Sequence, residues 1–216
     1  MTVEKVTSGT DVKIKTLIFD VGNVLLHRAQ QHSLGDWEKL LKAPHAELER
    51  LIYGGEMGIK AVCGEISDDE LWDWVARRFS LTPQQQKEMH LSFLSSYAPR
   101  PGLVRFIREL RGSYQLAIIS NASTALRFAL ENIYRIADAF DLIVCSAEEK
   151  LVKPNQEIYR RTLSRLGAAA DSTLLIDDRP DNIASAIALG MKGLLVQKEL
   201  DIPVELRKLG IVPRPS

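Results

Sequence analysis

Four short polar segments of this 216-residue sequence contain residue types that could carry out chemistry together. They are Asp20, Ser120-Asn121, Lys153-Pro154 and Asp177-Asp178. Three of the segments directly follow apolar runs, and the lysine segment lies in a loop before a helical pattern. An aspartate can act as a nucleophile, paired carboxylates can bind a hard metal ion, and lysine or serine can bind phosphoryl oxygens.

The elements that precede these segments predict that they meet in space. Short apolar runs alternate with helical patterns, which is typical of a doubly wound, Rossmann-like parallel sheet in an α/β protein. The strands are expected at about residues 13–19, 115–119, 142–144, 173–176 and 193–196. Because such sheets bind ligands at the carboxyl ends of their strands, all four polar segments should converge on one pocket.

Residues 29–97 have a different pattern, with four predicted helices and no strand. The helices should begin near Trp37, at Pro44, after Ser67 and after Thr82. Ser67 and Glu70 have the spacing of a capping box. We therefore expect an all-helical cap, residues 29–97, inserted after the first strand into a core formed by residues 1–28 and 98–216.

The helical periodicity of the insert also predicts which side chains face its interior. Leu40 should lie on the inner face of the first helix, and Leu71, Trp74 and Val75 on that of the third. The glycines Gly54-Gly55 and Gly58 should break the second helix.

Composition excludes several classes of protein. Lys+Arg and Asp+Glu are equal at 28 each, so no basic surplus indicates nucleic-acid binding. Cys63 and Cys145 match no metal-binding spacing and should be reduced thiols. The first ten residues have no apolar core typical of a signal peptide, and no apolar run reaches the ~20 residues of a membrane span. We expect a cytoplasmic monomer or homodimer that binds neither nucleic acid nor membrane.

The four polar segments together favour phosphoryl transfer. Three carboxylates in one pocket repel each other unless a cation is present, and oxygen ligands without histidine or cysteine favour Mg²⁺. With Lys153 and Ser120 available for phosphoryl oxygens, Asp20 could form an aspartyl-phosphate intermediate. Taken singly, Ser120-Asn121 and Asp177-Asp178 could be helix N-caps, and Lys153 a solvated loop lysine. Their joint occurrence at strand ends favours function.

The same segments resemble, in order, the four motifs of the haloacid dehalogenase superfamily, whose members are mostly phosphohydrolases. The resemblance covers nearly the whole chain, and the helical insert lies at the family's first cap position. Asp20-Val-Gly-Asn-Val is similar to the first motif of a subgroup of small-sugar phosphatases, the α-glucose-1-phosphate phosphatase-like proteins. Gly64-Glu-Ile-Ser67 in the insert also resembles that subgroup.

This resemblance implies a role for each segment. Asp20 would be the nucleophile, Ser120 and Lys153 would act on the phosphoryl group, and Asn121 would join them in binding substrate. Mg²⁺ would be held by Asp20, the backbone carbonyl of Gly22, Asp177 and Asp178. The substrate would be a small phosphorylated metabolite, with sugar phosphates expected first.

One position departs from the family pattern. Most phosphatases of the superfamily have a second aspartate two residues after the nucleophile, as general acid and base, and here that residue is Gly22. Either the leaving group needs little protonation, or His27, Glu56 or Glu65 substitutes, or the enzyme is weak. Two alternatives stay open. A haloacid dehalogenase would not need the paired carboxylates Asp177-Asp178, and a non-catalytic regulatory protein would not need the other motifs.

Overall fold

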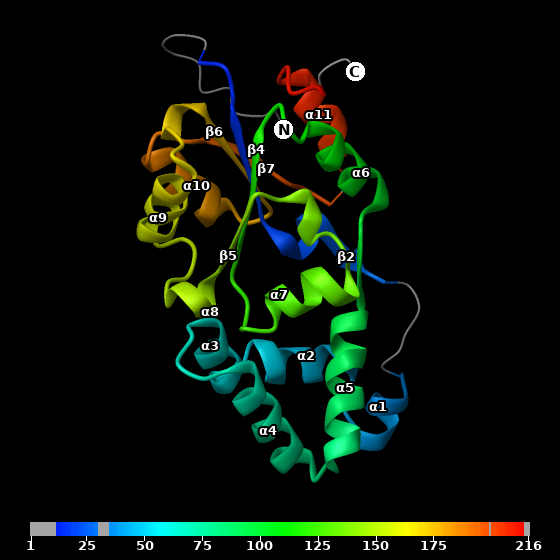
Figure 1. The fold of residues 1–216 in the computed structure, drawn as a ribbon. Coiled ribbons are helices and arrows are strands. Elements are labelled where there is room, and N and C mark those ends of the chain that lie inside the picture. The colour runs from blue at the N-terminus through cyan, green and yellow to red at the C-terminus, as the bar shows by residue number, and fades with distance from the viewer. Residues whose placement is uncertain (1–11, 30–34, 199, 214–216) are drawn as a thin grey trace.

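The computed structural model describes residues 12–29, 35–198 and 200–213, which are built around a five-stranded parallel sheet (Figure 1). The strand order is β5-β4-β1-β6-β7. The strands are β1 Thr16–Phe19, β4 Gln115–Ser120, β5 Leu142–Cys145, β6 Thr173–Asp177 and β7 Lys192–Leu195. The predicted α/β fold class is confirmed, although β1 begins at Thr16 rather than near Lys13.

Each face of the sheet has its own apolar cluster. Leu17 and Phe19 of β1 belong to one cluster and Ile18 to the other, because successive strand residues point to opposite faces. Helices α6 and α11 pack on the first face, and α9 and α10 on the second (Figure 1). Their bounds are α6 Pro101–Leu110, α9 Gln156–Leu166, α10 Pro180–Ala188 and α11 Ile202–Lys208. Burial on both sides explains the continuous apolar run of β1.

Short helical segments complete the connections of the core. They are η1 Val21–Leu25, α7 Leu126–Phe128, η2 Ala129–Ile133, η3 Ala137–Ala139, α8 Ser146–Glu149 and η4 Ala170–Ser172. Both cysteines are free thiols, as predicted. Within the described ranges, no helix combines the length and the apolar character needed to cross a bilayer.

Five helices of the insert lie beyond the carboxyl ends of the strands (Figure 1). They are α1 Gly35–Leu41, α2 His45–Tyr53, α3 Glu56–Val62, α4 Asp68–Phe79 and α5 Pro83–Ser95. These helices share a separate apolar cluster that includes Ile52, Trp72 and Phe93. The capping box predicted at Ser67 and Glu70 is confirmed at the start of α4.

The prediction of four helices in the insert is wrong, because α3 runs through Gly58, where a break was expected. A Cβ atom at Gly58 would lie 2.1 Å from the carbonyl oxygen of Ile52 in α2. Gly58 therefore allows the backbones of α2 and α3 to approach closely, and it does not end a helix.

Two short strands at the ends of the insert were also missed by the sequence. β2 (Leu26–Arg28) and β3 (Tyr97–Pro99) pair antiparallel, with His27 opposite Ala98. Strands of three residues are too short to show the period of two that identifies a strand in a sequence. The five helices lie between these strands in the chain, and the division into core and cap domains stays a prediction.

The inner faces of α1 and α4 were predicted only in part. Trp72, rather than Trp74, is the buried tryptophan of α4, and Leu40 is 53% exposed. Leu71 and Val75 are buried as expected. Trp72 is buried because it stacks on His90 of α5, with ring centroids 4.5 Å apart. This contact joins two helices, so the periodicity of one helix does not reveal it.

Gly64 tests how closely the insert approaches the core. Gly64 has a φ of +71°, and a Cβ atom there would lie 2.1 Å from the carbonyl oxygen of Ala147 in α8. Gly112 has a φ of +76° and no heavy atom within 4 Å of its Cβ position. We expect Gly112→Ala to lower the free energy of unfolding by about 1–2 kcal/mol through backbone strain, and Gly64→Ala by roughly 2–4 kcal/mol because the backbones must also separate.

Urea denaturation of the two variants measures this difference. Equal losses in the free energy of unfolding for Gly64→Ala and Gly112→Ala would show that the turn at Gly64 does not pack closely against α8.

Candidate active site

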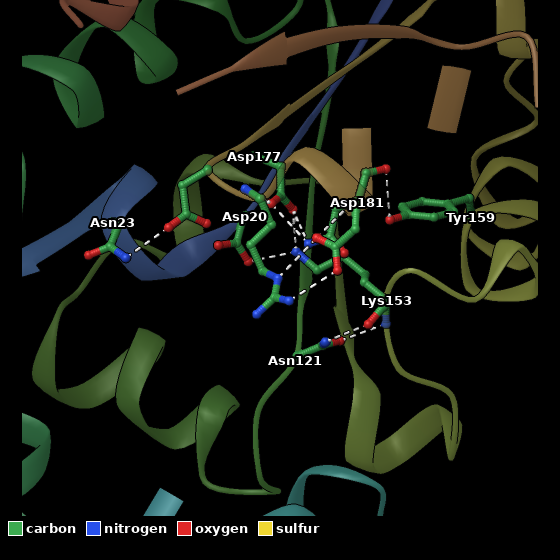
Figure 2. Close-up of polar contacts among 10 residues, drawn as sticks. Asp20, Asn23, Asn121, Lys153, Tyr159, Asp177 and Asp181 are labelled. Carbon is green, nitrogen blue, oxygen red and sulfur yellow. Dashed lines mark hydrogen bonds and ion pairs between the residues drawn. The ribbon is translucent and has the colours of Figure 1, made fainter. Parts of the chain in front are cut away.

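Three of the predicted side chains form a buried ionic cluster at the carboxyl ends of the strands (Figure 2). The Nζ atom of Lys153 lies 2.7 Å from Oδ1 of Asp20 and 2.6 Å from Oδ2 of Asp177. Asp20 follows β1 and Asp177 ends β6, and these strands pair with Phe19 beside Ile176. The parallel register therefore places the two carboxylates side by side, as the sequence predicted.

Asn121 holds the loop that delivers Lys153. Its Nδ2 atom donates to the Lys153 carbonyl oxygen at 2.9 Å, and its Oδ1 atom accepts from the Lys153 backbone N–H at 2.8 Å (Figure 2). The side-chain amide of Asn121 thus binds both polar backbone groups of Lys153. The binding of substrate by Asn121 stays a prediction, and its side chain holds the lysine loop in place.

Asp177 is surrounded by donors that the sequence reasoning missed. Nδ2 of Asn182 lies 2.9 and 3.0 Å from the two carboxylate oxygens of Asp177, and the backbone N–H of Arg179 donates to Oδ1 at 2.9 Å. Asn182 is 1% exposed in the first turn of α10, and its backbone carbonyl oxygen accepts from the Tyr159 hydroxyl at 3.3 Å. In the sequence, this contact could have been inferred from the position of an asparagine on the side of a predicted helix that faces the sheet.

Asp178 has a different partner, Asn23, which the sequence reasoning quoted but gave no role. Nδ2 of Asn23 donates to Oδ2 of Asp178 at 2.8 Å (Figure 2). Asn23 has a φ of +56°, a left-handed conformation that asparagine tolerates better than most residues. Nη2 of Arg100 donates to the backbone carbonyl oxygen of Asn23 at 3.2 Å and so links this turn to the start of α6.

The structural alternatives for these segments do not hold. The N-cap of α10 is Arg179, without a side-chain capping bond, so neither Asp177 nor Asp178 is the cap. Lys153 is 4% exposed, so it is not a solvated loop lysine. Ser120 is 5% exposed at the carboxyl end of β4 and does not cap α7, which begins at Leu126.

The proposed substitutes for an acid at position 22 are not joined to Asp20 by any contact among the described residues. Glu56 pairs with Lys60 at 2.7 Å, and Glu65 is exposed. His27 lies on β2, beside a pocket that also includes Arg100. Gly22 itself is exposed in η1, two residues after Asp20.

Burial changes the proton affinities of the cluster. Burial raises the pKa of Asp20 to about 6, with Lys153 acting to lower it and Asp177 acting to raise it further. Burial also acts to lower the pKa of Lys153, but the two carboxylates outweigh this effect, so its pKa is raised and the ammonium stays charged. A proton and a metal ion would therefore compete for the Asp20 carboxylate.

The donor set fits a hard divalent cation. Asp20, Asp177 and Asp178 each offer a carboxylate oxygen, and these three atoms lie within 4.8 Å of one another. Lys153 contacts two of these carboxylates, whereas Arg179 pairs with Asp181 at 3.0 Å. Three negative charges with one close positive charge leave an excess that a cation such as Mg²⁺ would relieve.

The family of the chain follows from comparison with known proteins. Residues 14–190 match the model of the haloacid dehalogenase-like hydrolase family. This match includes both strands of the ionic cluster and all four polar segments. The chain therefore belongs to the haloacid dehalogenase-like hydrolases.

Individual relatives share moderate sequence identity with this chain. The sesquiterpene phosphatase astK of Aspergillus oryzae is 26% identical over 198 residues, which are 90% of this chain and 96% of that protein. The pyrimidine 5'-nucleotidase YjjG of Escherichia coli is 29% identical over 119 residues, which are 54% of this chain and 53% of that protein.

A solved structure shows the same fold. The haloacid dehalogenase family enzyme bt-2542 of Bacteroides thetaiotaomicron superimposes with a TM-score of 0.76 at 20% identity, over 90% of this chain and 99% of its own. Another crystal structure of that enzyme contains magnesium and inorganic phosphate, and it superimposes with a TM-score of 0.74 over 88% of this chain and 97% of its own.

Replacing Lys153 tests the electrostatics of the cluster. Lys153→Met leaves two buried carboxylates facing each other, so we expect the free energy of unfolding at pH 7.5 in EDTA to fall by about 3–5 kcal/mol. Because the pKa of Asp20 is already raised to about 6, the loss should be smaller at pH 5, where Asp20 can take up a proton. Lys150→Met is the control, since Lys150 is an exposed lysine of the same loop. Equal urea denaturation curves for the two variants would contradict this account.

Proposed function

We propose that this protein is a Mg²⁺-dependent phosphatase of small phosphorylated metabolites, with Asp20 as the nucleophile. The observation that carries the proposal is the buried Asp20–Lys153–Asp177 cluster with Asp178 beside it. A carboxylate held by an ammonium and next to two further carboxylates suits phosphoryl transfer, in which positioning and charge neutralisation provide most of the catalysis.

The residues of this chain divide the work among themselves. Asp20, Asp177, Asp178 and the backbone carbonyl of Gly22 would hold Mg²⁺, which neutralises negative charge on the phosphoryl oxygens when bound. The Lys153 ammonium and the Ser120 hydroxyl bind phosphoryl oxygens. Asn121 holds the loop of Lys153, and Asn182 orients Asp177.

The reaction proceeds in two displacements at phosphorus. An Asp20 carboxylate oxygen forms a bond to phosphorus while the bond from phosphorus to the leaving oxygen breaks, and that oxygen departs with the electron pair. Water then forms a bond to phosphorus while the bond from phosphorus to the Asp20 oxygen breaks, and its electron pair restores the Asp20 carboxylate. Inorganic phosphate leaves, and the proton that the water loses passes to the phosphate or to solvent. Lys153 keeps one oxygen of Asp20 occupied at 2.7 Å, so Oδ2 is the oxygen available for attack.

The absence of a side chain at Gly22 affects which substrates can react. Its φ of −64° and ψ of 134° suit any residue, and a Cβ atom there would meet Oδ2 of Asp20 at 3.9 Å and no other heavy atom within 4 Å. The backbone therefore does not require glycine, and the side chain that usually protonates the leaving oxygen is simply missing. A good leaving group, such as the anomeric oxygen of a sugar 1-phosphate, needs this proton least.

The helical insert would act as a cap that selects the leaving group. Its five helices lie over the strand ends that carry the cluster (Figure 1). The domain division at residues 29–97, with the remainder as the catalytic core, follows from this role. A dehalogenase is the weaker alternative, because its chemistry gives no use to the Asp177 and Asp178 carboxylates next to the nucleophile.

A phosphate-release panel tests the proposed function. The substrates are glucose 1-phosphate, glucose 6-phosphate, a nucleoside monophosphate, a sesquiterpenyl monophosphate and p-nitrophenyl phosphate. We expect release with Mg²⁺, loss of release in EDTA, and a fall of at least about 10³-fold in Asp20→Asn, since the amide is a poor nucleophile. Phosphate release that persists in Asp20→Asn would rule out the covalent mechanism. In a separate assay with a 2-haloacid, halide release in EDTA would support the dehalogenase.

Restoring an acid at position 22 tests the effect of the glycine separately. We expect Gly22→Asp to increase kcat on glucose 6-phosphate by at least about tenfold and to change the rate on p-nitrophenyl phosphate little, because only the poor leaving group needs a proton. Gly22→Asn is the matched control, with the same shape and no acid. If Gly22→Asp and Gly22→Asn behave alike on glucose 6-phosphate, another group already supplies the proton.

A further inference from the structure

The start of α4 in the helical insert contacts the loop that follows Ser120. Asp68 is the first residue of α4 and is 6% exposed. Its Oδ1 atom accepts a hydrogen bond from the Ser123 hydroxyl at 2.5 Å, and its backbone N–H donates to Oγ1 of Thr124 at 3.1 Å. One residue of the insert therefore binds two successive residues of a core loop, through both its side chain and its backbone.

The other end of this loop belongs to the proposed active site. Ser120 ends β4, and Asn121 binds both backbone groups of Lys153. Between the two ends, the backbone N–H of Ala122 donates to the Ser146 hydroxyl oxygen at 3.0 Å. Residues 120–124 thus contact the cluster at one end and the insert at the other. Because this segment is short, a displacement of one end would move the other end too.

Two further contacts surround the connection between Asp68 and the loop after Ser120. The Ser146 hydroxyl, which fixes Ala122, donates to the carbonyl oxygen of Val62 at the end of α3, at 2.7 Å. On the far side of Asp68, Nε2 of His90 lies 3.2 Å from Oδ2, although without hydrogen-bond alignment. The ring of His90 stacks on the buried Trp72, so the apolar cluster of the insert supports the Asp68 side chain.

We propose that Asp68 is a positioning residue of the active site, and that its hydrogen bond to Ser123 couples the helical insert to the placement of Ser120 and Asn121. The inference rests on the proposed function for what those two residues do. A carboxylate that is buried at 6% exposure and bound to a hydroxyl of another segment has few alternative positions. A displacement of about 1 Å at a catalytic group can cost about 10²-fold in rate.

Enzyme kinetics on the full-length protein with p-nitrophenyl phosphate and Mg²⁺ provide the first test. We expect Asp68→Ala and Ser123→Ala each to lower kcat by about ten- to a hundredfold, with a smaller change in KM. The double variant should lose no more than the worse single variant, because both changes remove the same hydrogen bond. Asp68→Asn, which keeps an acceptor oxygen, should recover most of the activity.

Asp69→Ala is the matched control, since Asp69 is an exposed aspartate in the same first turn of α4. An unchanged kcat in Asp68→Ala, an equal loss in Asp69→Ala, or fully additive losses in the double variant would overturn the proposal.

Hydrogen–deuterium exchange provides a readout that does not depend on activity. We expect the amides of residues 121–125 to exchange faster in Asp68→Ala than in wild type and in Asp69→Ala. Unchanged exchange in this loop would overturn the coupling. If wild type releases no phosphate from any substrate, the proposed function fails, and the exchange comparison alone decides whether Asp68 holds the loop.

Discussion

The structure of the site depends on one buried ammonium group between two buried carboxylates. Removing Lys153, Asp20 and Asp177 from water is costly, and only close, aligned contacts offset that cost. The contacts of 2.6 and 2.7 Å are possible because β1 and β6 are neighbours in the sheet and because the loop before α9 reaches over their ends. Neutral donors then fix the charged groups, with Asn121 on the lysine loop and Asn182 on Asp177.

The cluster is electrostatically unbalanced, and this imbalance links structure to function. One ammonium contacts two of three neighbouring carboxylates, while the third, Asp178, is bound by the neutral amide of Asn23. If arginine side chains neutralised all three carboxylates, the cluster would be an ion network with only a structural role. The remaining negative charge would attract a cation, and the exposed position of Gly22 leaves Oδ2 of Asp20, the proposed nucleophile, without a neighbouring side chain at that residue.

The helical insert and the core meet through polar contacts that involve the ends of segments. Asp68 at the start of α4 binds the loop after β4, and Val62 at the end of α3 binds Ser146 of α8. At the opposite side, the Arg28 guanidinium of β2 donates to the Glu49 carboxylate of α2. The insert therefore contacts the core on both sides of the sheet edge that carries the ionic cluster. For this reason we expect the position of the insert and the geometry of the cluster to be coupled.

The sequence by itself determined the parallel sheet and the candidate residues, Asp20, Lys153 and Asp177, that the structure brings together. Apolar runs that end in aspartate or serine segments indicate burial and strand ends directly, and the capping box at Ser67 is a local signal. The contacts of Asn182, Asn23 and Trp72 were decided only by the tertiary structure, because their partners are brought near by packing. Helix α3 and the pair β2–β3 were missed for the same reason. A glycine that permits close approach looks like a glycine that breaks a helix, and a three-residue strand exists only through its pairing.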